Sequence, residues 1–169
     1  NAIGIYTVTI DETNRKDETF YINTDVTYTF TGSAVTGTYG TATAININDI
    51  TWTQEEIDAD PSDAPEGATT STVKSEGLKN KYKKQFNAQA AGLLAKTDWY
   101  VIKAADVDSY SVPDNIKTYR AAVRTKVNSM ETQIDGCSDV DALIILLTYT
   151  KDSEGVVSRP LGEFPDEVV

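Results

Sequence analysis

The spacing of hydrophobic residues changes from every second residue to every third or fourth along this chain. This change constrains the fold more than any other feature. Near the N-terminus, Val26, Tyr28 and Phe30 alternate with threonines, as in a strand with one buried and one solvated face. Between residues 116 and 134, hydrophobic residues recur at intervals of three and four, which predicts a long amphipathic helix. The sequence therefore predicts an α+β chain in which strands precede helices.

The N-terminal part reads as a threonine-rich, antiparallel β module. Of the 23 threonines, 14 lie within the first 53 residues, interleaved with β-branched and aromatic residues that favour strands. We expect five or six short antiparallel strands whose apolar face must be covered by another sheet, a helix or a partner chain. Thr53 and Glu56 fit a capping box, which predicts a short helix after the strands.

Charge divides the chain at the end of this module. Residues 17–73 carry ten acidic residues and no basic one, whereas residues 74–103 carry seven lysines against two acids. The segment from Asp60 to Gly67 adds two prolines and a glycine, as in a linker. The sequence thus predicts four segments: a β module (1–58), an acidic Pro-containing linker (59–73), a helical module (74–150) and an extended C-terminal arm (151–169).

The helical module is predicted to hold three helices. The first covers about residues 75–95 and places Leu78, Tyr82 and Phe86 on one face. The second begins after Pro113, ends at Asp135-Gly136, and carries this apolar seam: Ile116, Tyr119, Val123, Val127, Met130 and Ile134. The third is capped by Ser138-Asp139 and contains these residues: Leu143, Ile144 and Leu147. The seam fits either an intrachain hairpin with the first helix or pairing between copies, and spacing does not separate the two.

Composition excludes several classes of function. The chain has no histidine and one cysteine, Cys137, so a Ser-His-Asp triad, a His-ligated zinc or haem site and an internal disulfide are impossible. The net charge of −11 argues against a nucleic-acid partner. The longest aliphatic run, Ala142 to Leu147, is too short to span a bilayer. We therefore expect no metal, no cofactor, no nucleic acid and no membrane.

Two charged clusters each allow a functional and a structural interpretation. The segment from Asp58 to Asp63 resembles the start of a calcium loop, but its sixth position lacks the required glycine, so we favour a solvated linker. Four lysines form a basic cluster on the first helix: Lys79, Lys81, Lys83 and Lys84. We favour a helix face that is solvated or loosely paired with the acidic segment 49–66 over a nucleic-acid patch.

Cys137 and the aromatic pair Trp99 and Tyr100 are the remaining candidate functional residues. Cys137 precedes a helix cap, where its pKa could fall, but no histidine can activate it, so we expect a partly buried structural thiol. Trp99 and Tyr100 follow Thr97-Asp98 and begin either a new helical turn or an extended connector. They suit a binding surface or a core role that anchors the join between two helices, and we favour the core role. Nothing combines a nucleophile, a base and an electrophilic site, so the sequence predicts a non-enzymatic protein.

One stretch of the helical module resembles a known family. It consists of Ala91-Gly92-Leu93-Leu94-Ala95-Lys96-Thr97-Asp98-Trp99-Tyr100-Val101-Ile102, then Val112-Pro113, then Tyr119-Arg120-Ala121-Ala122-Val123-Arg124. This order resembles a helical module of tailed-bacteriophage tail and virion proteins, especially those of marine cyanophages. It is also similar to the C-terminal part of phage tail-fibre assembly proteins. The resemblance covers roughly residues 78–147 and carries no catalytic residue.

The resemblance implies a role in the phage particle or in its assembly. The first hypothesis is a virion structural protein (a tail, fibre, adaptor or decoration subunit) located in the virion, with other virion proteins and further copies of itself as partners. The second is a tail-fibre assembly chaperone that leaves the particle. The third is a host-surface carbohydrate-binding module using these aromatic residues: Tyr21, Tyr28, Tyr39 and Trp52. Because most of these positions fall on one strand face, we favour a core role for them.

Overall fold

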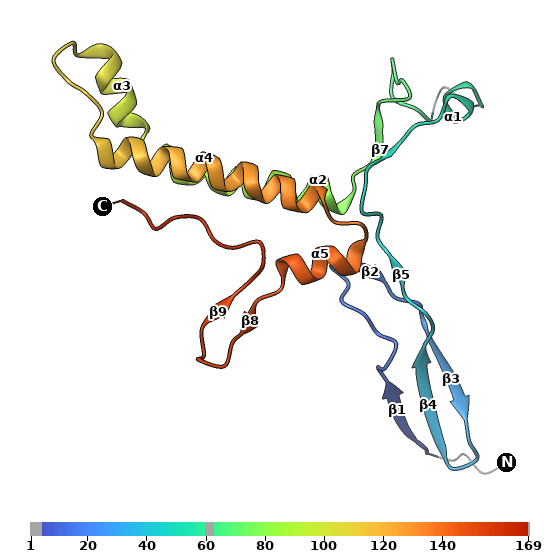
Figure 1. The fold of residues 1–169 in the computed structure, drawn as a ribbon. Coiled ribbons are helices and arrows are strands. Elements are labelled where there is room, and N and C mark those ends of the chain that lie inside the picture. The colour runs from blue at the N-terminus through green and yellow to red at the C-terminus, as the bar shows by residue number, and fades with distance from the viewer. Residues whose placement is uncertain (1–4, 60–62, 169) are drawn as a thin grey trace. The chain divides into compact units, whose positions relative to one another are not determined.

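The computed structural model describes residues 5–59 and 63–168, and it confirms the α+β class, with the helices mostly in the C-terminal part (Figure 1). The chain forms two compact units, residues 1–46 and 47–169. The boundary therefore lies twelve residues before the end of the β module that the sequence predicts. The reason is that the strand Ile50–Thr51 pairs inside the second unit, as described below.

A three-stranded sheet forms most of the first unit, in the order β1 (Thr7–Asp11), β4 (Ala34–Tyr39), β3 (Val26–Phe30). Strands β3 and β4 are antiparallel, but β1 pairs with β4 in parallel, so the prediction of a purely antiparallel module is wrong. The alternation of apolar and polar residues has the same period in both kinds of sheet, so it carries no information about strand direction.

A short second ladder completes this unit. Strands β2 (Tyr21–Ile22) and β5 (Thr43–Ala44) pair antiparallel, and the amide of Ile45 donates to the carbonyl of Phe20. Phe20 and Tyr21 are each 9% exposed and supply the buried aromatic side chains of the unit.

The second unit begins with two short strands and a short helix, most of which the sequence assigns to the β module and linker. Strand β6 (Ile50–Thr51) pairs antiparallel with β7 (Val73–Ser75), and helix α1 (Gln54–Ala59) follows β6. The predicted capping box forms: the amide of Glu56 donates to Thr53 Oγ1 at 3.2 Å, and the amide of Thr53 donates to Glu56 Oε2 at 3.0 Å. The last residue of the predicted linker, Val73, and the first two residues of the predicted helical module are therefore β structure.

A long helical hairpin forms the core of the second unit. Helices α2 (Leu78–Ala95) and α4 (Asp114–Asp135) lie side by side (Figure 1). Every residue of the predicted α4 seam is buried: Ile116, Tyr119, Val123, Val127, Met130 and Ile134. The seam closes an intrachain hairpin with α2, which decides between the two alternatives that the spacing left open.

Two shorter helices join this hairpin. Helix α5 (Val140–Leu147) begins as predicted, because Asp139 Oδ1 accepts a hydrogen bond from the amide of Ala142 at 2.8 Å. Helix α3 (Asp98–Asp106) occupies the stretch for which the sequence left a helical turn or a connector open. The described part of the helical module thus holds four helices instead of three.

The C-terminal residues contribute to the core, which corrects the prediction of an extended arm. After the short hairpin of β8 (Thr150–Lys151) and β9 (Val157–Ser158), Leu161 is completely buried. Its amide donates to the carbonyl of Leu146, and its carbonyl accepts a hydrogen bond from Lys126 Nζ at 2.7 Å. One leucine in a polar tail gives no periodic signal, so the sequence pattern missed this anchor.

Candidate functional site

Four residues of the segments 91–102 and 119–124 meet at the turn between α2 and α3. Thr97 is 4% exposed, and its Oγ1 donates to the carbonyl of Leu94, close to the end of α2. From α4, Arg120 NH1 donates to that carbonyl at 2.8 Å and to Thr97 Oγ1 at 2.7 Å. The same nitrogen pairs with Asp98 Oδ1 at 2.8 Å. We call these four residues the Arg120 cluster.

The charges of the Arg120 cluster suit a structural lock, by which we mean a set of contacts that holds the turn between α2 and α3 in one conformation. The Arg120 side chain is only 10% exposed, so its charge needs close acceptors to offset the loss of hydration. The Leu94 carbonyl lies in the last turn of α2, where the helix dipole favours a cation. Asp98 lies in the first turn of α3, where the dipole favours an anion, and its carboxylate is half exposed. The cluster thus fixes the start of α3 against α4.

Helix α3, which this lock holds, presents apolar side chains to solvent. None of its described residues is buried, and Trp99 and Ile102 are 51% and 61% exposed. The rings of Trp99 and Tyr100 lie 4.1 Å apart, and Lys103 Nζ lies 5.5 Å from the Trp99 ring centre. Trp99 therefore lies at the join of α2 and α3, but the expectation of a core role is wrong for it, and the residue belongs to an exposed aromatic surface. Tyr100 is half-buried.

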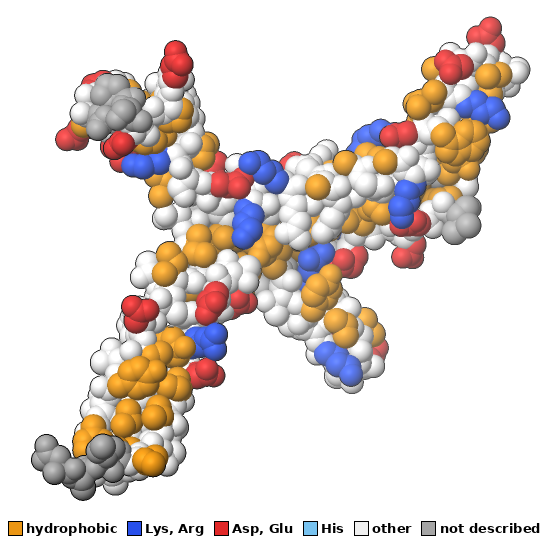
Figure 2. Space-filling view, turned by 180° about the vertical axis from the view of Figure 1, so that it is seen from behind, with side chains coloured by type: hydrophobic (Ala, Val, Ile, Leu, Met, Phe, Trp, Pro, Cys, Tyr) orange, Lys and Arg blue, Asp and Glu red, His pale blue; other side chains and the backbone are white. Residues whose placement is uncertain are grey.

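The sheet of the first unit has a second exposed apolar surface. Tyr28 and Phe30 are 60% and 52% exposed, although their alternation with threonines predicts a buried face. Figure 2 shows hydrophobic side chains gathered over this unit, which is the part that ends at the grey N-terminal residues. Among the proposed glycan-binding residues, Tyr28 and Tyr39 lie on neighbouring strands, Tyr21 is buried as expected, and Trp52 belongs to the other unit.

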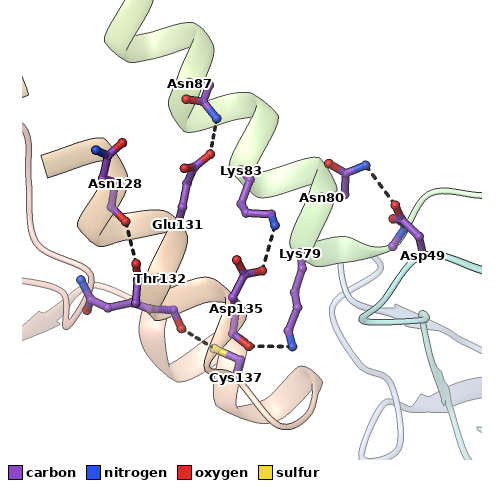
Figure 3. Close-up of polar contacts among 12 residues, drawn as sticks. Asp49, Lys79, Asn80, Lys83, Asn87, Asn128, Glu131, Thr132, Asp135 and Cys137 are labelled. Atoms are coloured by element: carbon purple, nitrogen blue, oxygen red, sulfur yellow. Dashed lines mark hydrogen bonds and ion pairs between the residues drawn. The ribbon is translucent and has the colours of Figure 1, made fainter. Parts of the chain in front are cut away.

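Three lysines of the α2 cluster have close partners outside segment 49–66, and Asp49 of that segment adds a smaller attraction on Lys84. Lys83 Nζ lies 2.8 Å from Asp135 Oδ1, and Lys79 Nζ donates to the Asp135 carbonyl at 3.0 Å (Figure 3). Lys84 pairs with Glu76 at 2.6 Å, and this carboxylate raises the pKa of Lys84. Because α4 ends at Asp135, the two lysines also complement the negative end of its dipole. These contacts join α2 to α4.

Cys137 lies between α4 and α5 and is 8% exposed. Its Sγ lies 3.5 Å from the Gln133 carbonyl (Figure 3). Burial raises the pKa of the thiol, which outweighs the opposite effect of Lys79. Although Cys137 precedes a helix cap, its thiol is therefore not activated, which agrees with the structural thiol that the sequence predicts.

The candidate calcium loop lies partly outside the described residues, which omit Asp60, Pro61 and Ser62. Of its other carboxylates, Asp58 and Asp63 are exposed. In the described ranges 5–59 and 63–168, no group of three or more His, Cys, Asp or Glu side chains is placed to hold a metal ion. In the same ranges, no helix has the length and apolarity needed to cross a membrane.

Comparison of the chain with protein-family models, with curated proteins and with solved structures finds no match. The geometry of the two exposed apolar surfaces and of the Arg120 cluster therefore carries the functional argument.

Proposed function

We propose that this chain is a non-enzymatic structural subunit of a bacteriophage virion, acting through contacts with other virion proteins and with further copies of itself. The observation that carries the proposal is the Arg120 cluster. The motif elements around Thr97-Asp98 and Tyr119-Arg120, which resemble phage tail and virion proteins, contact one another across two helices. Together they hold an exposed aromatic helix, α3, in a fixed place.

The polar groups of the motif support a role in architecture. Arg120 NH1 is engaged by three protein oxygens, from Leu94, Thr97 and Asp98. These contacts all engage NH1 and stabilise the turn, which is a structural use of a buried guanidinium. Beside exposed Lys103 and Asp106, α3 presents the apolar side chains of Trp99 and Ile102 to solvent, and such side chains are enriched at the centre of protein interfaces.

The extent of exposed surface also supports a protein that works by contact. The chain exposes 11423 Å². Compact monomeric units of the sizes found here would expose about 3,200 and 6,500 Å², even without any contact between them. The excess of roughly 1,700 Å² is about twice the area, about 800 Å², that each partner buries in a standard protein–protein interface.

Quantitative mass spectrometry of gradient-purified phage particles, relative to the major capsid protein, tests the proposal. We expect a fixed stoichiometric ratio, which would also indicate a position in the capsid, tail tube or fibre. Absence from purified particles, with presence in the infected-cell lysate, would refute retention in the virion. That outcome would favour the assembly chaperone, for which an exposed α3 is equally suitable as a client-binding surface.

A variant of α3 makes this test sharper. We expect Trp99→Ser to reduce the number of copies per particle, because the exposed indole is the largest apolar group of the helix. Asp106→Ser, at an exposed charged position of the same helix, is the matched control and should leave the copy number unchanged. Equal incorporation of both variants would exclude α3 as the contact surface.

A further inference from the structure

We propose that the apolar face of the β1-β4-β3 sheet is a self-association interface, which pairs with the same face of a second copy of this chain. The strand register places Ile10, Gly37 and Tyr28 in one row across the sheet, and Val8, Val35 and Phe30 in the next. Because side chains alternate along a strand, both rows point to the same side. Tyr6, Val26 and Tyr39 extend this side by one position on their strands. We call these nine residues the apolar sheet face.

The opposite side of the sheet has a different chemistry. Its rows consist mostly of threonines, with Thr9, Thr36 and Thr29 across one row. Threonine suits a strand surface that stays in water. The two sides of the sheet thus differ: the threonine side is suited to contact with water, and the apolar side is suited to burial against a partner.

The apolar sheet face forms a continuous surface across its central strand. Gly37 has no side chain, and the Ile10, Val26 and Tyr28 side chains lean over it. A Cβ at this position would lie 2.7 Å from Ile10 Cδ1 and from Val26 Cγ1, and 2.9 Å from Tyr28 Cε1. The Tyr6 and Phe30 rings pack edge to face at 4.6 Å. The residues of the face therefore contact each other and form one surface.

The exposed area is close to what a dimer needs. Five residues carry most of it, with these exposed fractions: Tyr6 45%, Val8 55%, Ile10 39%, Tyr28 60% and Phe30 52%. With aromatic side chains of about 150–250 Å² and somewhat smaller aliphatic ones, the face leaves roughly 500–600 Å² of apolar surface. A standard interface buries about 800 Å² per partner. The face thus supplies most of the area that one partner contributes to such an interface.

A second copy of this chain matches the face in area and in chemistry. None of the nine residues of the apolar sheet face is charged, so the face offers nothing to pair with a charged partner. At the margin of the face, the Arg15 guanidinium carbon lies 5.9 Å from the Tyr39 ring centre. A second apolar sheet face has the same uncharged centre. Two such sheets can stack at about 10 Å with interdigitating side chains, as in a sandwich.

Sedimentation equilibrium of the full chain, compared with two lysine variants, tests this inference. Tyr28→Lys places a charge in the middle of the face. Thr29→Lys places the same charge on the next residue, which is exposed on the threonine side. We expect the wild type and Thr29→Lys to self-associate at micromolar concentration, and Tyr28→Lys to associate about 100-fold more weakly or not at all. A wild type that stays monomeric at 100 µM, or equal association of the two variants, would overturn the inference.

Cysteine labelling keeps the test decisive if Tyr28→Lys fails to fold. In a Cys137→Ala background, Tyr28→Cys should be protected from a thiol reagent at high protein concentration and react on dilution. Thr29→Cys should react equally at both concentrations, and equal behaviour of the two would overturn the inference. The inference extends the self-association part of the proposed function. A chain that pairs through this face but is absent from purified particles would refute the virion role alone.

Discussion

Replacing Arg120 with methionine tests whether the Arg120 cluster is a structural lock. Methionine keeps most of the buried aliphatic volume and removes the hydrogen-bond donors to Leu94, Thr97 and Asp98. A hydrogen bond to a charged group contributes about 1.5–3 kcal/mol. The Leu94 carbonyl keeps its bond from the Thr97 hydroxyl, and half-exposed Asp98 regains water, so its pair contributes at most about 1 kcal/mol. We therefore expect a loss of about 2–4 kcal/mol in the free energy of unfolding.

Urea unfolding followed by tryptophan fluorescence measures this loss, because both tryptophans, Trp52 and Trp99, lie in the second unit. With a urea dependence of about 2 kcal/mol per molar, the midpoint should fall by roughly 1–2 M. Arg124→Met is the matched control, since Arg124 is exposed one turn further along α4, and its midpoint should stay within about 0.3 M. If Arg120→Met shifts the midpoint no more than Arg124→Met, the cluster is not a lock.

Four further outcomes follow from single positions. Tyr119→Phe should leave the free energy of unfolding in urea unchanged or raise it by up to about 1 kcal/mol, because Tyr119 Oη is buried without a hydrogen-bond partner among the described residues. A decrease in that free energy of more than about 1 kcal/mol would show that the hydroxyl has a partner. Leu161→Ala should cost about 2–5 kcal/mol in the same assay, and an unchanged midpoint would show that the C-terminal residues are not anchored. Because burial raises the pKa of Cys137, the neutral thiol stabilises the fold below about pH 8.5, and this stabilisation is lost as pH rises through the folded pKa. Alkylation of Cys137 in the native protein should be slow and should start at higher pH than alkylation in urea, and identical pH profiles of alkylation would contradict this. The pKa of Asp139 is lowered, mainly by the hydrogen bond from the Ala142 amide, so the stabilisation by this carboxylate is present above about pH 4 and is lost as pH falls through the folded pKa. Asp139→Ala should therefore lower Tm at pH 7 more than at pH 3, and an equal change at both pH values would count against a charged cap.

The helical hairpin shows how far a sequence pattern reaches. The α4 seam from Ile116 to Ile134 is buried throughout, and the helix begins after Pro113 and ends before Gly136, as predicted. These features are local: each depends on residues within one or two turns, so spacing and capping preferences determine them. The Arg120 cluster was beyond the same reasoning. Arg120 and Thr97 lie 23 positions apart, and nothing in their own neighbourhoods indicates that they touch.

The sequence alone determined the two long helices, the caps of α1 and α5 and the residues of each apolar stripe, because these depend on steric and hydrogen-bonding preferences of neighbouring residues. Only the tertiary structure decided which stripe is covered. The α4 seam packs against α2, whereas the sheet stripe around Tyr28 and the Trp99 surface of α3 stay open. It also decided the parallel pairing of β1 with β4 and the anchoring of Leu161. Each of these depends on which distant segment the chain brings into contact, and a periodic pattern of hydrophobic residues does not encode the identity of its partner.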